Sequence, residues 1–203
     1  GRGDKAAVEA VFATAHHITE MVLDSNRVAG SPMEPRSYVA DYDTDREELT
    51  LWATSQTPHY LKRWLANYTL FIPEHRIRVI APDVGGGFGL KVHYAVEIPT
   101  VAWASMLLGR PVKWTATRSE TLMSDAQARD HHTRARMAFD AEGRILAMEA
   151  DTIASLGAYL SNFAPSIPGN SYPQTITGLY TTPVAYLRVR GTYANTVPVD
   201  AYR

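Results

Sequence analysis

The sequence predicts an α+β fold, a two-layer arrangement in which a mixed β-sheet carries helices packed on one face. Short runs rich in β-forming residues recur along the chain, and residues 49–54 alternate most clearly. Two stretches with a helical spacing of apolar residues, 60–68 and 96–108, each follow such a run. The alternating runs 132–140 and 145–153 flank a glycine-containing turn, so a hairpin is expected to extend from the sheet.

The N-terminal part of the chain is expected to supply one helix and two further strands. Asp4 is a suitable N-cap for a helix over residues 5–15. Residues 16–24 and 37–43 alternate as strands do, and two prolines make the segment between them irregular. Glu34 lies in that segment, where we expect it to accept hydrogen bonds from backbone N–H groups and so to stabilise the loop.

The remaining elements follow from β-forming runs and from helix breakers. Strands are expected at residues 76–81, 111–118 and 187–193, and Gly109 is expected to end the helix before the second of them. Residues 155–182 are rich in Gly, Pro, Ser and Tyr, which indicates a long loop. Long loops within compact domains are often functional.

The most informative stretch is Gly-Gly-Gly-Phe-Gly at residues 85–89, between a predicted strand and a predicted helix. Backbone N–H groups in such a turn suit anions and negatively polarised oxygens, and glycine permits close approach to a ligand. Phe88 within the run suggests a shaped pocket wall. The dinucleotide fingerprint fails because Leu90 replaces its third glycine, and the P-loop pattern fails because Val92 follows Lys91. A nucleotide-phosphate binder is therefore disfavoured, whereas a simple tight connection stays open.

Gln56 is the second candidate, because it follows the predicted strand 49–54 at its carboxyl end. Thr57 and Pro58 directly after it are expected to open the next helix. Ligands of sheets flanked by helices favour the carboxyl ends of strands. Because residues 85–89 follow the next predicted strand in the same way, the two strand ends are expected to converge on one site.

Composition narrows the classes of function. The chain has 203 residues, 45% of them hydrophobic, which suits a folded globular protein. Its net charge of -1 gives no reason to expect nucleic acid or an anionic membrane as a partner. The absence of cysteine excludes disulfides, thiolate zinc sites and iron–sulfur ligation by this chain. With no signal sequence or bilayer-spanning apolar run, we expect a cytoplasmic location.

Other polar and aromatic residues are expected to be structural. The histidine pairs His16–His17 and His131–His132 do not suit chelation, because adjacent residues of a strand point to opposite faces, so no protein-ligated metal is expected. Glu120, Asp125 and Asp130 are expected to be solvated loop carboxylates and not acid–base pairs. Arg118 and Glu120 are expected to form a structural ion pair. The tryptophans are expected in the core: Trp52, Trp64, Trp103 and Trp114.

Taken in order, several segments resemble the molybdopterin-binding large subunit of the xanthine dehydrogenase and aldehyde oxidase family, which includes carbon monoxide dehydrogenase. The matching segments are residues 31–36, 49–59, 78–91, 109–114 and 201–203. Each motif alone is modest evidence, but the ordered set covers nearly the whole chain. The resemblance implies a molybdenum cofactor-binding domain fold, with residues 1–203 forming a single such domain within a longer large subunit.

The resemblance also implies roles for particular residues. The implied cofactor-binding residues are Gln56, Gly86, Gly87, Phe88 and Gly89. Gln56 resembles the glutamine that hydrogen-bonds an oxo ligand of molybdenum, and Gly87 and Phe88 resemble the pair whose backbone lies against the metal's oxygen ligands. Arg203 resembles the active-site arginine that contacts substrate in some members, so Gln56 and Arg203 are the implied catalytic residues. In this family the pterin dithiolene holds the metal, not protein side chains.

Departures from the family pattern narrow the substrate. Val92 stands where purine-oxidising members carry a glutamate, which favours an aldehyde, a small heterocycle or carbon monoxide over a purine. The family's glutamate base lies outside this chain. The implied activity is therefore that of a molybdenum-dependent oxidoreductase within the full subunit; the alternative is an isolated, inactive scaffold that binds at most an anion or pterin through residues 85–89.

The resemblance implies a cofactor and partners as well. The cofactor is molybdopterin with molybdenum, in a dinucleotide form, and it is expected to be absent from the isolated chain. The implied partners are the remainder of the large subunit, iron–sulfur and FAD-containing subunits or domains, and a small-molecule substrate.

Overall fold

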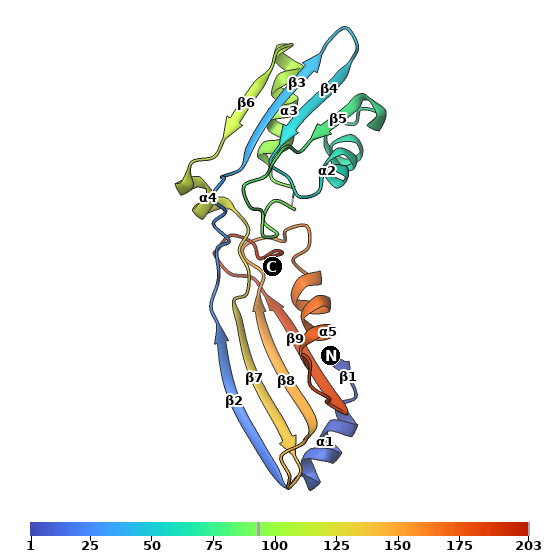
Figure 1. Ribbon diagram of the computed structural model, residues 1–203, viewed down its shortest axis with the longest axis vertical. Helices are drawn as coiled ribbons and strands as arrows, with labels where there is room; N and C mark the ends of the chain where they lie inside the picture. The colour runs from blue at the N-terminus through green and yellow to red at the C-terminus, as the bar shows by residue number, and fades with distance from the viewer. Residues whose placement is uncertain (93, 203) are drawn as a thin grey trace. The chain divides into compact units, whose positions relative to one another are not determined.

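The computed structural model describes residues 1–92 and 94–202 (Figure 1). Contacts divide the chain into two compact units, which we call unit 1 and unit 2. Unit 1 comprises Gly1–Val28 and Gln127–Val199, and unit 2 comprises Ala29–Ala126 together with the segment from Asp200 onward. Unit 1 contains a five-stranded sheet and unit 2 a four-stranded sheet. The prediction of a single domain over residues 1–203 stays a prediction.

The sheet of unit 1 has the strand order β1-β9-β8-β7-β2, and only the β8–β9 pair is parallel. In that order the strands span Arg2–Gly3, Val184–Thr192, Ile145–Ser155, His131–Phe139 and His17–Ser25. The β7–β8 hairpin predicted from the sequence is confirmed, but it belongs to this sheet. The prediction that it extends from the sheet carrying the two main helices was wrong, because it pairs with β2 and β9 instead.

Helix α1, Lys5–Thr14, covers part of one face of this sheet. Asp4 caps it as predicted, since its Oδ1 accepts a hydrogen bond from the N–H of Ala7 at 3.0 Å. Val8 and Phe12 pack from the helix against small alanines of β7 and β8. The predicted long loop before β9 contains two short helices, the π-helix η3 at Ile167–Ser171 and α5 at Tyr172–Thr175.

Strand β2 forms one edge of this sheet, and all nine of its residues are exposed. Its large apolar residues point to both faces of the sheet: Ile18, Met21, Val22 and Leu23. Native edge strands are usually short or interrupted by charges and prolines. A long, regular and partly apolar edge is therefore an unusual feature of unit 1.

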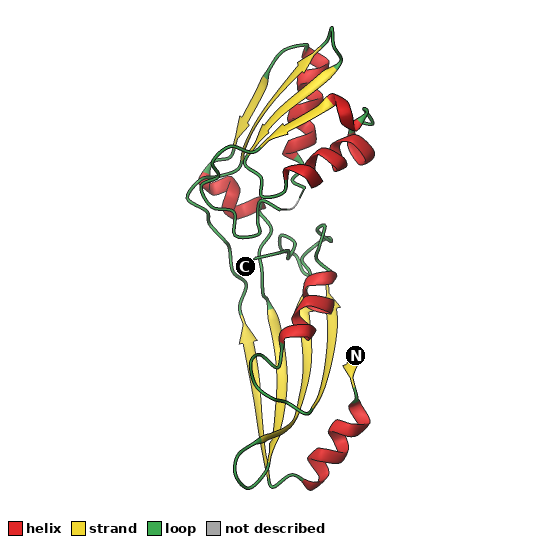
Figure 2. Cartoon of the chain, turned by 45° about the vertical axis from the view of Figure 1, so that its right-hand side comes forward, coloured by secondary structure: helices red, strands yellow, loops and turns green. Residues whose placement is uncertain are grey.

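The sheet of unit 2 has the order β5-β4-β3-β6, and its β4–β5 pair is parallel. The strands β3 to β6 span Ser37–Asp43, Glu48–Ala53, Ile77–Ile80 and Val112–Thr115. The helical segments are α2 Pro58–Trp64, the π-helix η1 Leu65–Thr69, the 3-10 helix η2 Glu74–Arg76, α3 Glu97–Leu108 and α4 Arg118–Ser124. Figure 2 shows these helices and strands by colour.

Burial along β4 shows why the helices of unit 2 gather on one face. Leu49 and Leu51 are fully buried against α2, η1 and α3, whereas Trp52 points to the other face and is 38% exposed. This confirms the predicted class, a mixed sheet with helices packed on one face. Trp52 and Trp103, the latter 58% exposed, were wrongly predicted to be core residues.

Helix ends in unit 2 follow the sequence signals in part. Pro58 occupies the first turn of α2 as predicted, but the Thr57 hydroxyl donates to the Val92 carbonyl instead of capping the helix. Gly109 ends α3 in the left-handed conformation. Among the described residues, no helix is both long and apolar enough to cross a lipid bilayer.

Candidate functional site

Two strand ends meet in unit 2, as the sequence predicts. β4 and β5 are adjacent and parallel, with Trp52 opposite Ile80, so the segments that follow them leave the same edge of the sheet. Gln56 follows β4, and the glycine loop, residues 85–89, follows β5. The backbone N–H of Gln56 donates to the carbonyl of Lys91 at 3.0 Å, which joins the two segments directly.

The side chain of Gln56 also contacts the glycine loop. Its Oε1 accepts a hydrogen bond from the backbone N–H of Gly89 at 2.9 Å. Gly87 lies so close that an added Cβ would stand 2.4 Å from that same oxygen. Only a residue without a side chain fits between Gln56 and the loop, which explains the glycine at position 87.

The loop backbone is bent by residues with positive φ. Gly86 has φ +90°, Gly89 has +98°, and Phe88 has +52°, which is uncommon for a residue with a side chain. A Cβ at Gly89 would lie 2.4 Å from the carbonyl oxygen of Ala201. The Phe88 ring lies beside Gly86 and is 42% exposed, so it forms part of the surface. That it forms a pocket wall stays a prediction.

Several N–H groups of the loop are used internally. Those of Gly85, Gly86, Gly89 and Leu90 donate to acceptors within unit 2. Within the part of the chain that the structure describes, the N–H groups of Gly87 and Phe88 donate to no acceptor.

The Oε1 atom of Gln56 faces Gly89, and its amide Nε2 donates to no acceptor among the described residues. Three donor groups in one small region therefore have no acceptor among the described residues. Donors in a bend of this kind suit a negatively polarised oxygen.

Glu34 behaves as predicted from the sequence. Its Oε2 accepts from the N–H of Gly85 at 2.8 Å and so holds the start of the glycine loop. The same oxygen pairs with Lys91 Nζ at 2.7 Å, an interaction that sequence reasoning missed. Burial alone would raise the pKa of Glu34, but the hydrogen bonds from Lys91 and Gly85 outweigh it and hold that pKa below its usual value.

Other candidates proved different from their predictions. Arg118 and Glu120 form no ion pair: Glu120 completes a capping box with Thr117, and Arg118 donates to the carbonyl oxygens of Pro32 and Met33. Asp125 is not solvated, because it is 4% exposed and pairs with buried Arg36 at 2.6 Å. The nearby turn and strand signals gave no sign of this buried pair. Arg203, the predicted catalytic arginine, lies outside the described residues.

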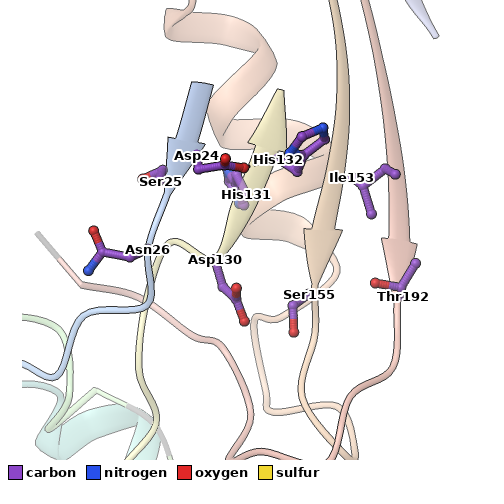
Figure 3. Close-up of a pocket in the computed structure, with 9 residues that line it drawn as sticks. All are labelled: Asp24, Ser25, Asn26, Asp130, His131, His132, Ile153, Ser155 and Thr192. Carbon is purple, nitrogen blue, oxygen red and sulfur yellow. Dashed lines mark hydrogen bonds and ion pairs between the residues drawn. The ribbon is translucent and has the colours of Figure 1, made fainter. Parts of the chain in front are cut away.

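The histidine pairs lie in unit 1 at opposite ends of the β2–β7 pairing, because β2 begins at His17 and the antiparallel β7 begins at His131. His132 Nδ1 lies 2.6 Å from Asp24 Oδ1, and the His131 ring contacts Tyr172. His131 and His132 line a pocket with a volume of about 210 Å³. Figure 3 shows the residues that line it. Asp130, which also lines this pocket, pairs with Arg27 at 2.8 Å, and its side chain is 37% exposed. No group of three or more metal-ligating side chains occurs among the described residues.

Comparison with known proteins identifies the family of the chain. The chain belongs to the molybdopterin cofactor-binding domain family, whose model matches residues 1–203. Similar curated proteins include the carbon monoxide dehydrogenase large chain of Afipia carboxidovorans, which is 40% identical over 193 residues, covering 95% of this chain and 24% of the relative. The nicotine 6-hydroxylase large subunit of Paenarthrobacter nicotinovorans is 35% identical, covering 100% of this chain and 25% of the relative.

A solved structure shows the same fold. The quinoline 2-oxidoreductase of Pseudomonas putida 86 superposes with a TM-score of 0.92 at 33% identity, covering 100% of this chain and 25% of that one. The family resemblance expected from the sequence is therefore confirmed. The chain spans about a quarter of the length of these relatives.

Proposed function

We propose that the glycine loop and Gln56 form one wall of the molybdenum cofactor site in a molybdenum hydroxylase large subunit. The observation that carries the proposal is the group of available donors, the N–H groups of Gly87 and Phe88 and the amide of Gln56. Gly86 and Gly89 have the positive φ values that bend the loop on either side of Gly87 and Phe88. When bound, the cofactor would supply two-electron oxidation chemistry at molybdenum.

The residues of the chain would bind and orient the cofactor. Gln56 would donate from Nε2 while its Oε1 stays on Gly89, so that the side chain is already oriented before binding. Gly87 and Phe88 would donate to polarised oxygens without reorganisation, which is how fixed dipoles stabilise charge in enzymes. The Phe88 ring would shield one side of the site from water. Arg203 is proposed, from the resemblance alone, to contact substrate and stabilise developing negative charge.

We further propose that the whole enzyme oxidises an aldehyde, a small heterocycle or carbon monoxide, and not a purine. Val92 supports this, because the family resemblance implies a substrate-binding glutamate at that position in purine-oxidising members. The relatives named above are a carbon monoxide dehydrogenase, a nicotine hydroxylase and a quinoline oxidoreductase. The pterin is proposed to be a dinucleotide, with iron–sulfur and FAD-containing subunits or domains accepting the electrons. The proposed location is cytoplasmic.

The test is the molybdenum and pterin content of the full large subunit, purified from a host that makes the cofactor. Gln56→Ala should lower both contents several-fold, and Gln174→Ala, a surface glutamine of α5 paired with Asn170, should not. Unchanged contents in the Gln56 variant would remove this residue from the site.

The same assay on the 203-residue chain decides whether this chain holds the cofactor by itself. We expect no stoichiometric metal there, because the chain spans about a quarter of its relatives. Near-stoichiometric molybdenum in the short chain would contradict that expectation.

A further inference from the structure

Glu34 and Lys91 connect the two ends of the glycine loop through one oxygen atom. Glu34 Oε2 accepts from the N–H of Gly85, the first residue of the loop, at 2.8 Å, and from Lys91 Nζ, two residues past its last glycine, at 2.7 Å. The backbone N–H of Glu34 also donates to the Gly85 carbonyl at 3.2 Å. Both ends of the loop are therefore attached to the same residue.

The attachment depends on close packing. An added Cβ at Gly85 would lie 2.6 Å from the Cβ of Glu34, so only glycine lets the two backbones approach. The side chain of Lys91 is 0% exposed, and that of Glu34 is 34% exposed. Burying an ammonium without a counterion costs much free energy. Lys91 can therefore be buried here only because Glu34 pairs with it.

The middle of the loop is held separately. Gly89 donates to Gln56 Oε1, and the Lys91 carbonyl accepts from the Gln56 N–H. Lys91 thus takes part in both sets of contacts, because its side chain pairs with Glu34 and its backbone carbonyl accepts from Gln56. Between these attachments, only the N–H groups of Gly87 and Phe88 have no acceptor among the described residues.

We propose that Glu34 and Lys91 are a positioning pair, which fixes the loop conformation that presents the N–H groups of Gly87 and Phe88 to the cofactor. The inference rests on the proposed function, since it assigns a role to two residues that touch the loop and not the cofactor. Glu34 and Lys91 act through Gly85 and Gln56 and are not catalytic residues. An ion pair that only stabilised the fold would not have to contact both ends of the same loop, as Glu34 and Lys91 do.

The first measurement is amide hydrogen exchange in the 203-residue chain, which needs no cofactor. Glu34→Gln keeps an acceptor for Gly85 but removes the charge, and Lys91→Met removes the ammonium but keeps an unbranched side chain one atom shorter. We expect exchange of the Gly85 and Gly89 amides to rise about tenfold in each variant, the size expected for one lost hydrogen bond. The matched controls Glu48→Gln and Lys113→Met, two exposed residues of the same sheet, should change neither amide.

The double variant Glu34→Gln/Lys91→Met separates positioning from stability. It leaves no unpaired buried charge, so unit 2 should regain most of its thermal stability. If the pair positions the loop, Gly89 exchange stays fast, and molybdenum content in the full subunit stays low. If slow Gly89 exchange and the molybdenum content both recover together with stability, the pair is purely structural and the inference is overturned.

The outcomes also separate this inference from the proposed function. Unchanged Gly85 and Gly89 exchange in both single variants would overturn the positioning role alone. Faster loop exchange with an unchanged molybdenum content of the full subunit would place the cofactor elsewhere, and would overturn the proposed function together with the inference.

Discussion

Gly87→Ala should disable the candidate site while leaving the fold intact. The new Cβ would stand 2.4 Å from Gln56 Oε1 and 2.5 Å from its Cδ, far inside van der Waals contact. Gly87 does not have a positive φ, so alanine fits the local backbone. Because Gln56 is an exposed and flexible side chain, it will move away and lose its hydrogen bond from Gly89.

The expected cost follows from that single hydrogen bond. A net loss of about 1 kcal/mol is typical. For a unit of this size it lowers the melting temperature by about 4–8 °C. Gly89→Ala is the contrasting variant, because its φ is +98° and its Cβ would meet the Ala201 carbonyl oxygen at 2.4 Å. Because backbone atoms cannot move aside as a side chain does, this variant should lower the free energy of unfolding by about 1–3 kcal/mol or more.

The assay is a double-mutant cycle with Gln56→Ala, read by exchange of the Gly89 amide. Gly87→Ala should speed that exchange in the native background and have no further effect once Gln56 is alanine. The full subunit carrying Gly87→Ala should also contain several-fold less molybdenum. Equal effects of Gly87→Ala in both backgrounds would refute the reasoning, because the substitution would then not act through Gln56.

Three further predictions concern the rest of the molecule. Arg36→Met leaves buried Asp125 without its partner and should cost about 3–5 kcal/mol in urea unfolding, and a loss below about 1 kcal/mol would contradict the buried pair. Phe12→Ala should cost about 3–5 kcal/mol in unit 1 without changing Gly89 exchange; faster exchange there would be the contrary result. Burial lowers the pKa of His131 below 6.5, so the unfolded chain binds the proton first. The free energy of unfolding of unit 1 should be highest above about pH 6.5 and should decline as the pH falls through the folded-state pKa of His131. His131→Gln should make this dependence on pH less steep, and an unchanged pH dependence would refute the prediction.

Local signals predicted most of the elements and the meeting of the two strand ends. The Asp4 cap, the Gly109 terminus and the glycine turn before β8 depend on a few neighbouring residues, and each acts as its sequence indicates. The convergence of Gln56 and the glycine loop followed from a general rule on the carboxyl ends of strands. Such features need no knowledge of distant partners.

Partnerships across long stretches of sequence could not be predicted. Arg36 pairs with Asp125, 89 positions away, and Glu34 pairs with Lys91, 57 positions away. Charge and spacing near each residue give no information on these partners, so the sequence predicts a solvated carboxylate at Asp125. The division into two sheets was missed for the same reason. Alternation predicts that the hairpin strands exist, but only the distant β2 and β9 decide which sheet they join.

The order of segments along the chain has a consequence for synthesis. The strands of unit 2 are all complete by Thr115, whereas His17 of β2 pairs with Phe139 of β7. A chain emerging from the ribosome can therefore form the four-stranded sheet while β2 still waits for a partner, with its apolar residues open to chaperones or to aggregation. The glycine loop can complete its packing only later, because Gly89 packs against Ala201. Cofactor insertion should accordingly follow translation of this region, and should not accompany it.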